Sequence, residues 1–511
     1  MALKTFAAIH VGSGEVYLKI FELSRKSGLQ VIDYARYYIE LGGDTFSKGY
    51  ISHELVYELC SVLKGFRIKM DEYGITDYVA YAGSAVREAG NCELILDLIR
   101  IRTGLKVTCV DNAEQSFLML KAAAGSIPPF EKLIREGAVI VDMGAGSLQV
   151  TIYDAGKLIF THAFKLGALR IRELLSDLES QTSDFNSVMN DYVGNEFDTF
   201  SAMVEETSGI SHLIAIGEEV YPVLAITRTE GETGSFKPEK LDQYYDRIKN
   251  MGFDEIAEKY AIPFEAATLI KPEMVVYASL LRVMHADMIW FSRVNLCDGI
   301  AEEYFESQNT LKTGHDFTTD IRNHARAISA HYDCDNIHTD NVCRHAMNIF
   351  DGLQKFAVLS PRDRLLLEIA CLLHDSGKYV NMSAGAEFSW YIVLATEFVG
   401  ISLAEKQIIA GIIRYHTWSE IPMPADLAIN MGHDDYIRML KLAAILRIAR
   451  AMDRSHKQKM KKTVITVKDK KLVIRADTIN DITLEQSMVD EKASYFEAVY
   501  GLRPVLRMKK R

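Results

Sequence analysis

Two glycine-rich segments carry the residue types of a phosphate-binding turn. Residues 9–14 read Ile-His-Val-Gly-Ser-Gly and residues 141–146 read Val-Asp-Met-Gly-Ala-Gly. Glycines at such a bend allow positive φ and bring backbone N–H groups against an oxyanion. One copy alone would be an ordinary hairpin turn, but two copies in matching register indicate a duplicated phosphate cleft. The candidate phosphate-binding residues of the two turns are Gly12, Ser13, Gly14, Asp142, Gly144, Gly146 and Ser147.

Apolar stretches on both sides of each turn predict two strand–turn–strand units. Residues 5–9 and 16–21 flank the first turn, and residues 138–141 and 148–153 flank the second. A further apolar run at 107–110 predicts a strand that leads into a helix. Residues 231–240 are rich in glycine and polar residues, so a surface loop is expected there.

This arrangement resembles the actin/Hsp70/sugar-kinase superfamily and, within it, the exopolyphosphatase and guanosine-pentaphosphate phosphohydrolase (Ppx/GppA) family. Residues 81–89 are similar to the family loop that carries a phosphate-contacting arginine, which is Arg87 here. Residues 110–118 are similar to a Glu-Glu-Ala-Arg-Leu helix start, and residues 214–217 to the strand before the last glycine loop, of which Gly217 remains. The resemblance implies a duplicated two-lobe α/β fold that hydrolyses polyphosphate or guanosine pentaphosphate.

Several family positions carry altered residues. The aspartate of the first family turn is His10, and the closing glutamate of the second turn is Gln149. The water-activating glutamate corresponds to Gln115, which follows Glu114, and a late family arginine corresponds to Cys297. The family's catalytic positions are therefore occupied in degenerate form by Glu114, Gln115 and Gln149.

These exchanges have a common chemical sense. Hydrolysis of a phosphoanhydride needs a divalent cation and a carboxylate that activates water. Glutamine cannot accept a proton or neutralise Mg²⁺, and loss of a general base costs about 10²–10⁴ in rate. Glu114 or Glu15 could take over the lost roles, but neighbouring residues of a helix point about 100° apart. We expect a cleft that binds polyphosphate or guanosine penta- or tetraphosphate, binds Mg²⁺ poorly, and hydrolyses the phosphates weakly or not at all.

A second candidate site lies in the amphipathic helices that follow residue 320. This region resembles the HD metal-dependent phosphohydrolases, whose signature is a histidine, a His-Asp pair and a distant aspartate. The matching residues are His338, His374, Asp375 and Asp453. Helical phase places His338, His374 and Asp453 on apolar faces, where a buried carboxylate is costly unless it is paired or bound to metal. The resemblance implies one divalent ion, for which the mixed ligands suit Mn²⁺, Fe²⁺ or Zn²⁺.

The structural alternative is that these residues only support the helices. An inward histidine is often a satisfied core residue, and His374-Asp375 before Gly377 also fits a helix C-terminus. The full set in the right order favours the metal. Many HD proteins carry extra histidines after the pair, where this chain has Ala386 and Phe388, so one ion is expected even though His416 is retained.

Length and composition predict several domains. A chain of 511 residues with 48% hydrophobic residues exceeds the size of a single core. We expect one lobe at 1–128, a second at 129–305, an all-α HD-like domain at 315–460 and a small α+β module at 461–511. In this module, residues 464–474 predict a hairpin and residues 484–500 a helix.

Charge and cysteine content limit the partners. The net charge of −11 argues against bulk nucleic-acid binding. A basic cluster at 447–462 is either a solvated helix end or, as in the family, part of a polyphosphate channel. There is no membrane-length apolar run and no signal peptide, so a cytoplasmic protein is expected. The seven cysteines lack a Cys-x-x-Cys pair and are expected to be reduced core residues.

Three functions remain open at this point. The first is a phosphohydrolase of the Ppx/GppA kind, and the second is a non-catalytic regulator that binds a phosphate anion. The third is a phosphoesterase that works through the HD metal site. The family resemblance also implies a homodimer.

Overall fold

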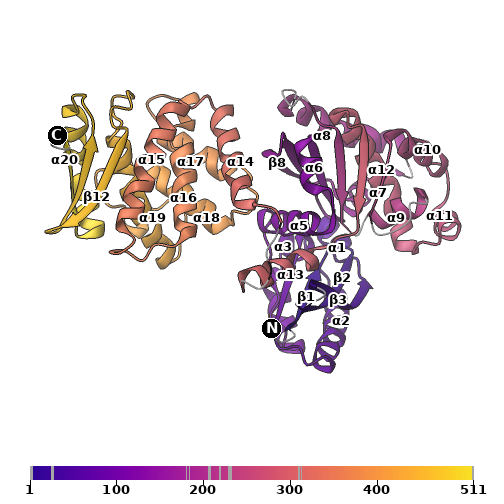
Figure 1. Cartoon of the computed structure of the whole chain (residues 1–511). Helices are drawn as coiled ribbons and strands as arrows, with labels where there is room; N and C mark the ends of the chain where they lie inside the picture. Colours follow the sequence, from indigo (N-terminus) through magenta and orange to yellow (C-terminus); the bar gives the residue numbers. More distant parts are fainter. Residues whose placement is uncertain are drawn as a thin grey trace. The chain divides into compact units, whose positions relative to one another are not determined.

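The computed structural model divides the chain into two compact units, Met1–Phe317 and Thr318–Arg511 (Figure 1). It describes residues 4–24, 28–179, 181–182, 184–204, 209–217, 220–227, 233–308, 311 and 314–508. Among the helices of these ranges, none is long and apolar enough to cross a membrane.

The first lobe of unit 1 is built on a five-stranded sheet in the order β3-β2-β1-β4-β5. The first predicted hairpin is confirmed, because β1 (Lys4–Val11) and β2 (Glu15–Ser24) pair antiparallel around the glycine turn. The predicted strand at 107–110 is reduced to two residues. The remaining elements are β3 (Gly28–Tyr38), α1 (Leu41–Lys48), α2 (His53–Glu72), β4 (Tyr78–Ala82), α3 (Ser84–Glu88), α4 (Cys92–Thr103), β5 (Thr108–Cys109) and α5 (Asn112–Ser126).

The second lobe repeats this topology. Its six-stranded sheet has the order β10-β11-β9-β6-β7-β8. As in the first lobe, a three-stranded antiparallel meander is extended by parallel strands on the side of its first strand. The strands are β6 (Ala138–Met143), β7 (Leu148–Asp154), β8 (Lys157–Phe164), β9 (His212–Ile216), β10 (Thr233–Phe236) and β11 (Met288–Ser292).

The helices of the second lobe pack around this sheet and enclose a core of their own. The prediction of a surface loop at 231–240 is partly wrong, because a strand and the start of a helix lie in this range. Residues 231–232 lie outside the described residues, but β10 pairs antiparallel with β11 and α10 follows directly. The helices are α6 (Phe130–Arg135), α7 (Ala168–Glu179), α8 (Phe185–Val204), α9 (Val220–Thr227), α10 (Pro238–Ile248), α11 (Phe253–Tyr260) and α12 (Phe264–Met284).

Helix α13 (Leu296–Ser307) returns the chain to the first lobe. It follows β11 in sequence but packs against α5 and β1. The rings of Phe6 and Tyr304 stack with their centroids 4.0 Å apart, and Lys19 donates to Asp298 at 2.8 Å. Together, α5 and α13 connect the two sheets of unit 1.

Unit 2 is a helical domain with a small sheet that share one hydrophobic core. The predicted hairpin at 464–474 and the predicted helix at 484–500 are both present. A third strand, β14, pairs parallel with β13 and was not expected. The elements are α14 (Phe317–His331), α15 (Asn336–Leu353), α16 (Pro361–Leu373), η1 (Ser376–Tyr379), α17 (Gly385–Ala395), α18 (Leu403–Tyr415), η2 (Pro424–Asp426), α19 (His433–Ala451), β12 (Lys462–Lys468), β13 (Lys471–Asp477), α20 (Thr483–Tyr500) and β14 (Arg503–Met508).

Candidate functional site

The two glycine turns lie face to face between the lobes of unit 1. A Cβ atom added at Gly14 would lie 3.6 Å from the Cβ of Ala145. A Cβ added at Gly146 would collide with the hydroxyls of Ser13 and Ser84, which are themselves 3.0 Å apart. The two turns can therefore lie this close together only because glycine at position 146 has no side chain.

Two small cavities lie at this contact, with volumes of about 50 and 20 Å³. Gln115, Gly144 and Ser147 line both of them. These volumes are far below the roughly 300–1,000 Å³ of ordinary ligand pockets. A phosphate chain can enter only if the two turns move apart. The other lining residues are His10, Gly12, Ser13, Gly14, Glu15, Tyr17, Gly83, Ser84, Ala145 and Gly146 in one cavity, and Asn112, Ser116, Asp142, Gln149 and Ala163 in the other.

The two glutamates that could replace the lost carboxylates make bonds of their own. Glu15 forms an ion pair with Arg36, whose Nε donates to it at 2.8 Å. Glu114 accepts a hydrogen bond of 2.9 Å from the hydroxyl of Tyr81. Because Gln115 lines both cavities while the carboxylate of Glu114 bonds Tyr81, the helical offset between these neighbours is visible in the structure.

Burial shifts the pKa values of two side chains in the cleft. Burial lowers the pKa of His10 to about 4, so that its ring is neutral at pH 7. Its Nε2 atom is buried and has no hydrogen-bond partner in the part of the chain that the structure describes. Burial raises the pKa of Asp142 to about 7, so this carboxylate is only partly ionised at neutral pH. Gln149 donates to the hydroxyl of Thr161 at 2.6 Å.

Two arginines lie next to the turns. Arg87 donates to the carbonyl oxygen of Val110 at 2.6 Å and also bonds the side chain of Asn112. Arg170 donates from Nε to the carbonyl oxygen of Gly146 at 2.7 Å and pairs with Glu88 at 2.9 Å. The sequence alone assigned no role to Arg170, because its nearly complete burial depends on tertiary packing.

The remaining predicted residues of unit 1 lie in two places. Gly217 follows β9 with a φ of +118°, a conformation that favours glycine. Cys297 is buried at the start of α13.

The second candidate site is a cluster of buried histidines in unit 2. His338 lies on α15, His374 follows α16 and His416 follows α18. Each uses Nδ1 locally: His338 bonds Asp453 at 2.8 Å, His374 bonds the carbonyl of Cys371 at 2.8 Å, and His416 bonds that of Ile413 at 2.6 Å.

These bonds leave Nε2 as the free nitrogen of each ring. A carbonyl or carboxylate accepts a hydrogen bond from the protonated Nδ1, so the lone pair of the neutral ring lies on Nε2. The Nε2 atoms of His338, His374 and His416 are buried and have no hydrogen-bond partner within the described residues. Burial lowers the pKa of His374 to about 4, and it also lowers that of His416. Neutral imidazoles with an inward lone pair are the form that binds metal.

Asp375 lies at the centre of this cluster. Its oxygens are 3.9 Å from Nε2 of His338 and 3.6 Å from Nε2 of His374. Lys378 donates to the same carboxylate, and Arg450 lies 3.6 Å away. Burial acts to raise the pKa of Asp375, but the surrounding positive groups hold it well below its usual range. The carboxylate is therefore ionised at neutral pH.

The four predicted ligands have different positions. His338, His374 and Asp375 face one another, whereas Asp453 lies behind His338 on its Nδ1 side and accepts a second bond from the backbone of Gln458 at 3.0 Å. A carboxylate in this place orients a metal-binding imidazole and fixes its tautomer. Nε2 of His338 and the carboxylate of Asp375 are thus donors for a divalent ion, with Asp453 as the support of His338, whereas His374 lies outside the group of described residues whose donor atoms converge.

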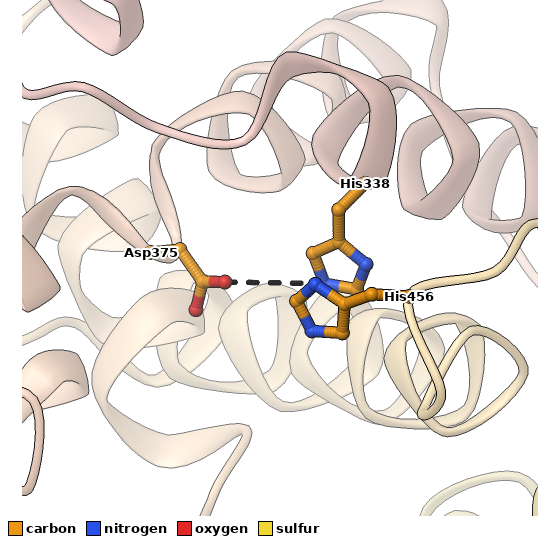
Figure 2. A group of neighbouring side chains, drawn as sticks. All are labelled: His338, Asp375 and His456. Atoms are coloured by element: carbon orange, nitrogen blue, oxygen red, sulfur yellow. Dashed lines mark ion pairs between the residues drawn. The ribbon is translucent and has the colours of Figure 1, made fainter.

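His456 was not anticipated from the sequence. Donor atoms of His338, Asp375 and His456 all lie within 4.8 Å of one another, and Figure 2 shows the two imidazoles beside the carboxylate. The His456 ring stacks on His338 with centroids 3.6 Å apart. A left-handed backbone, with φ of +54°, places it there, and the helical pattern ends before this residue.

The basic cluster at 447–462 is partly internal. Arg447 is buried and donates to the carbonyl of His416 at 2.7 Å, and Lys459 pairs with the buried Glu485 at 3.0 Å. Arg450 faces Asp375. These three cations bind groups within unit 2 and are not part of a solvated basic surface.

Comparison with known proteins identifies the class. The model of the Ppx/GppA phosphatase family matches residues 20–307, and that of Ppx/GppA phosphatase, domain III, matches residues 321–493. The chain belongs to the Ppx/GppA phosphatase family, as its turns suggested. The matched range in unit 2 is a family domain, and its resemblance to HD phosphohydrolases stays a prediction.

Similar proteins cover most of the chain at low identity. A guanosine-5'-triphosphate,3'-diphosphate pyrophosphatase of Aliivibrio fischeri is 17% identical over 455 residues, with 86% of each chain covered. The protein of this name from Photobacterium profundum is 20% identical over the same length. Among solved structures, an exopolyphosphatase from Cytophaga hutchinsonii covers 61% of this chain and all of its own, with a TM-score of 0.53 and 16% identity. The Aquifex aeolicus family member gives a TM-score of 0.50 at 18% identity, covering 60% of this chain and 99% of its own. At these identities the structures establish the fold alone.

Proposed function

We propose that the cleft of unit 1 binds a chain of phosphates, either polyphosphate or a guanosine penta- or tetraphosphate, and hydrolyses it weakly or not at all. The names of the similar proteins support this ligand class, since they include guanosine pentaphosphate pyrophosphatases and an exopolyphosphatase. The glycine turns and the serine hydroxyls around them supply the donors that a phosphate needs.

One observation carries the loss of hydrolysis. The side chains that line the cavities at the family's catalytic positions are the amides Gln115 and Gln149 and the neutral ring of His10. The nearby carboxylates of Glu15 and Glu114 are committed to Arg36 and Tyr81. No described group among these residues combines the position and the basicity that water activation requires.

Mg²⁺ does not fit this cleft. Hard cations require several oxygen ligands, commonly carboxylates, and Asp142 is the remaining acidic residue at the second turn. Its pKa of about 7 leaves it half protonated near neutral pH. No step of the proposed function depends on a cation here, because binding uses backbone and hydroxyl donors.

Calorimetry with polyphosphate tests binding. Ser147 lines both cavities, and a hydrogen bond to a charged group contributes about 1.5–3 kcal/mol. Ser147→Ala should weaken binding by about 10- to 100-fold. Ser126→Ala is the matched control, because that hydroxyl bonds Ala123 and Ser292 away from the turns. Equal binding by wild type and Ser147→Ala would place the anion elsewhere.

A second candidate function is a metal-dependent phosphoesterase in unit 2. The three buried Nε2 atoms, which have no hydrogen-bond partner among the described residues, favour it, because buried polar atoms are normally bonded. His338, Asp375 and His456, whose donor atoms lie within 4.8 Å of one another, would hold the ion, and His374 or His416 would complete the set. A bound Mn²⁺, Fe²⁺ or Zn²⁺ would supply charge neutralisation at a phosphoryl group and acidify water.

The residues around the ion have their own tasks. Asp453 would hold His338 in the binding tautomer, and Lys378 and Arg450 would contact the anionic substrate once Asp375 is bound to metal. Elemental analysis after metal loading and dialysis tests the site: a stoichiometric ion supports it, and no ion makes the histidines structural. The homodimer remains a separate prediction, which light scattering after gel filtration checks.

A further inference from the structure

Two cysteines meet at the edge of the first lobe. The Sγ atoms of Cys92 and Cys109 lie 3.5 Å apart. Cys92 is the first residue of α4, and Cys109 is the last residue of the short strand β5. The two thiols come from different elements that face each other at the end of the sheet.

These two cysteines differ from the other five. The sequence predicted that all seven would be reduced core residues; all seven are free thiols, and the pair packs against the core of the first lobe but is only partly buried. Cys92 and Cys109 are half-buried, while the others are buried. Small oxidants can therefore reach the pair more easily than Cys60, Cys297, Cys334, Cys343 and Cys371.

We propose that Cys92 and Cys109 are a reversible oxidation site that forms a disulfide when the protein meets a peroxide. The sulfurs must approach by about 1.5 Å to reach the bond length of about 2.05 Å. The start of α4 is anchored, since the side chain of Asn91 donates to and accepts from the backbone of Ile51 at 2.8 and 3.1 Å. Most of the movement should therefore occur at Cys109.

The reaction consumes one peroxide and both thiols. The thiolate of Cys92 attacks one oxygen of hydrogen peroxide, the O–O bond breaks, and the departing hydroxide takes up the proton that the thiol released and leaves as water, which gives a sulfenic acid. The sulfur of Cys109 then attacks the Cys92 sulfur, the S–O bond breaks, and a second water leaves. Burial and the neighbouring thiol raise the pKa of Cys109 to about 12, so it acts second. A small dithiol reverses the reaction by exchange.

A Cys92–Cys109 disulfide would affect the phosphate cleft through the residues that follow Cys109 in the chain. Val110 follows Cys109, its N–H donates to Ala82 at 3.0 Å, and its carbonyl accepts from Arg87 at 2.6 Å. Asp111 then caps α5 through the N–H of Glu114 at 2.8 Å, and α5 carries Gln115 into both cavities. A shift of Cys109 towards α4 therefore moves the anchor of Arg87 and the start of α5.

Peptide mapping of the peroxide-treated full chain tests the site. After alkylation and digestion without reductant, a Cys92–Cys109 peptide pair should appear that is lighter by two hydrogens and disappears with dithiothreitol. Cys92→Ser and Cys109→Ser should each abolish it. Cys371→Ser is the matched control and should leave it unchanged, because Cys371 is fully buried. Links among other cysteines, or terminal oxidation of Cys92 without a link, would overturn the proposal.

Hydrogen exchange on the same samples tests the reach of the link. Amides of residues 108–116 should exchange at different rates in the oxidised and reduced protein, while those of unit 2 stay unchanged. A disulfide without any change in residues 108–116 would show that it does not act on the cleft. Neither measurement depends on phosphate binding, so this inference can fail or hold independently of the proposed function.

Discussion

The cleft of unit 1 and the histidine cluster of unit 2 offer different kinds of groups to a ligand. In the cleft, the backbone turns remain, but amides occupy carboxylate positions and the spare carboxylates of Glu15 and Glu114 are bonded elsewhere. In unit 2, the side chains remain, with buried Nε2 atoms around Asp375. An anion site made of backbone donors survives side-chain exchange, whereas a metal site depends on each ligand and its support.

The largest effect is expected at Asp375. Asp375→Ala removes the central carboxylate of the cluster, so the protein should lose any stoichiometric metal after loading with Mn²⁺ or Zn²⁺ and dialysis. Asp340→Ala is the matched control, because this exposed carboxylate lies on the same helix as His338 and pairs with Arg326. Elemental analysis gives the answer. If Asp375→Ala retains the metal, the ion does not depend on this carboxylate, and the difference that we infer between the two regions is wrong.

A carboxylate restored to the cleft should revive hydrolysis. Gln115→Glu places a general base where the side chain lines both cavities. Phosphate release from polyphosphate should rise about 10²-fold, at the lower end of the usual 10²–10⁴, since His10 and Gln149 remain. Glu114→Gln, a change of the neighbour that bonds Tyr81, serves as control and should have no effect. A fall in rate in Glu114→Gln would instead assign Glu114 the role of base.

The support of His338 should matter less than the ligands. Asp453→Asn keeps the shape at Nδ1 of His338 but removes the charge, so metal affinity should fall by about 10- to 100-fold. Competition with a chelator measures this. Complete loss of metal in Asp453→Asn would show that Asp453 is itself a ligand, as the sequence predicted.

A further effect, on stability rather than on ligand binding, concerns the pH dependence of the cleft. The pKa of Asp142 is about 7 in the folded protein, above its ordinary value of 3.8, so the folded state holds this proton more tightly. The associated stability is present below about pH 4 and is lost as the pH rises to 7. Asp142→Asn should therefore gain in unfolding free energy relative to wild type between pH 4 and 7, and no further above it.

Urea unfolding at several pH values measures that difference. Asp191→Asn, at an exposed position of α8, is the control and should show no such trend. A gain that is equal at pH 4 and pH 8 would mean that Asp142 is ionised in the folded protein throughout this range, and the cleft would then be a better cation site than we propose.

Sequence patterns predicted the local elements well. Alternating apolar residues predicted both glycine hairpins and the hairpin of β12 and β13. The helix α20 was also predicted. They missed β14, because its six residues gain their partner from β13 through parallel pairing at a distance in sequence. The packing of α13 against α5 and β1 could not be predicted for the same reason.

The chemistry of the sites was only partly readable. Residue types singled out His338, His374, Asp375 and the amides of the cleft as candidates, since each lies in a recognisable motif, and their roles stay predictions. Contacts between residues that are distant in sequence could not be predicted. They include the hydrogen bond between His338 and Asp453, the ion pair of Glu15 with Arg36, and the contact between the thiols of Cys92 and Cys109. These contacts depend on tertiary packing, which also brings His456 onto His338 from outside any helical repeat.

One experiment tests the central claim most directly: calorimetry and phosphate release measured together on the Asp375→Ala protein with polyphosphate and Mg²⁺. This substitution silences the unit 2 site, so any turnover belongs to the cleft. The account predicts binding that weakens with salt and with Ser147→Ala, and no phosphate released above the level of a Gln115→Ala variant. Steady phosphate release that disappears in Gln115→Ala or Glu114→Ala would show an active cleft and contradict the account.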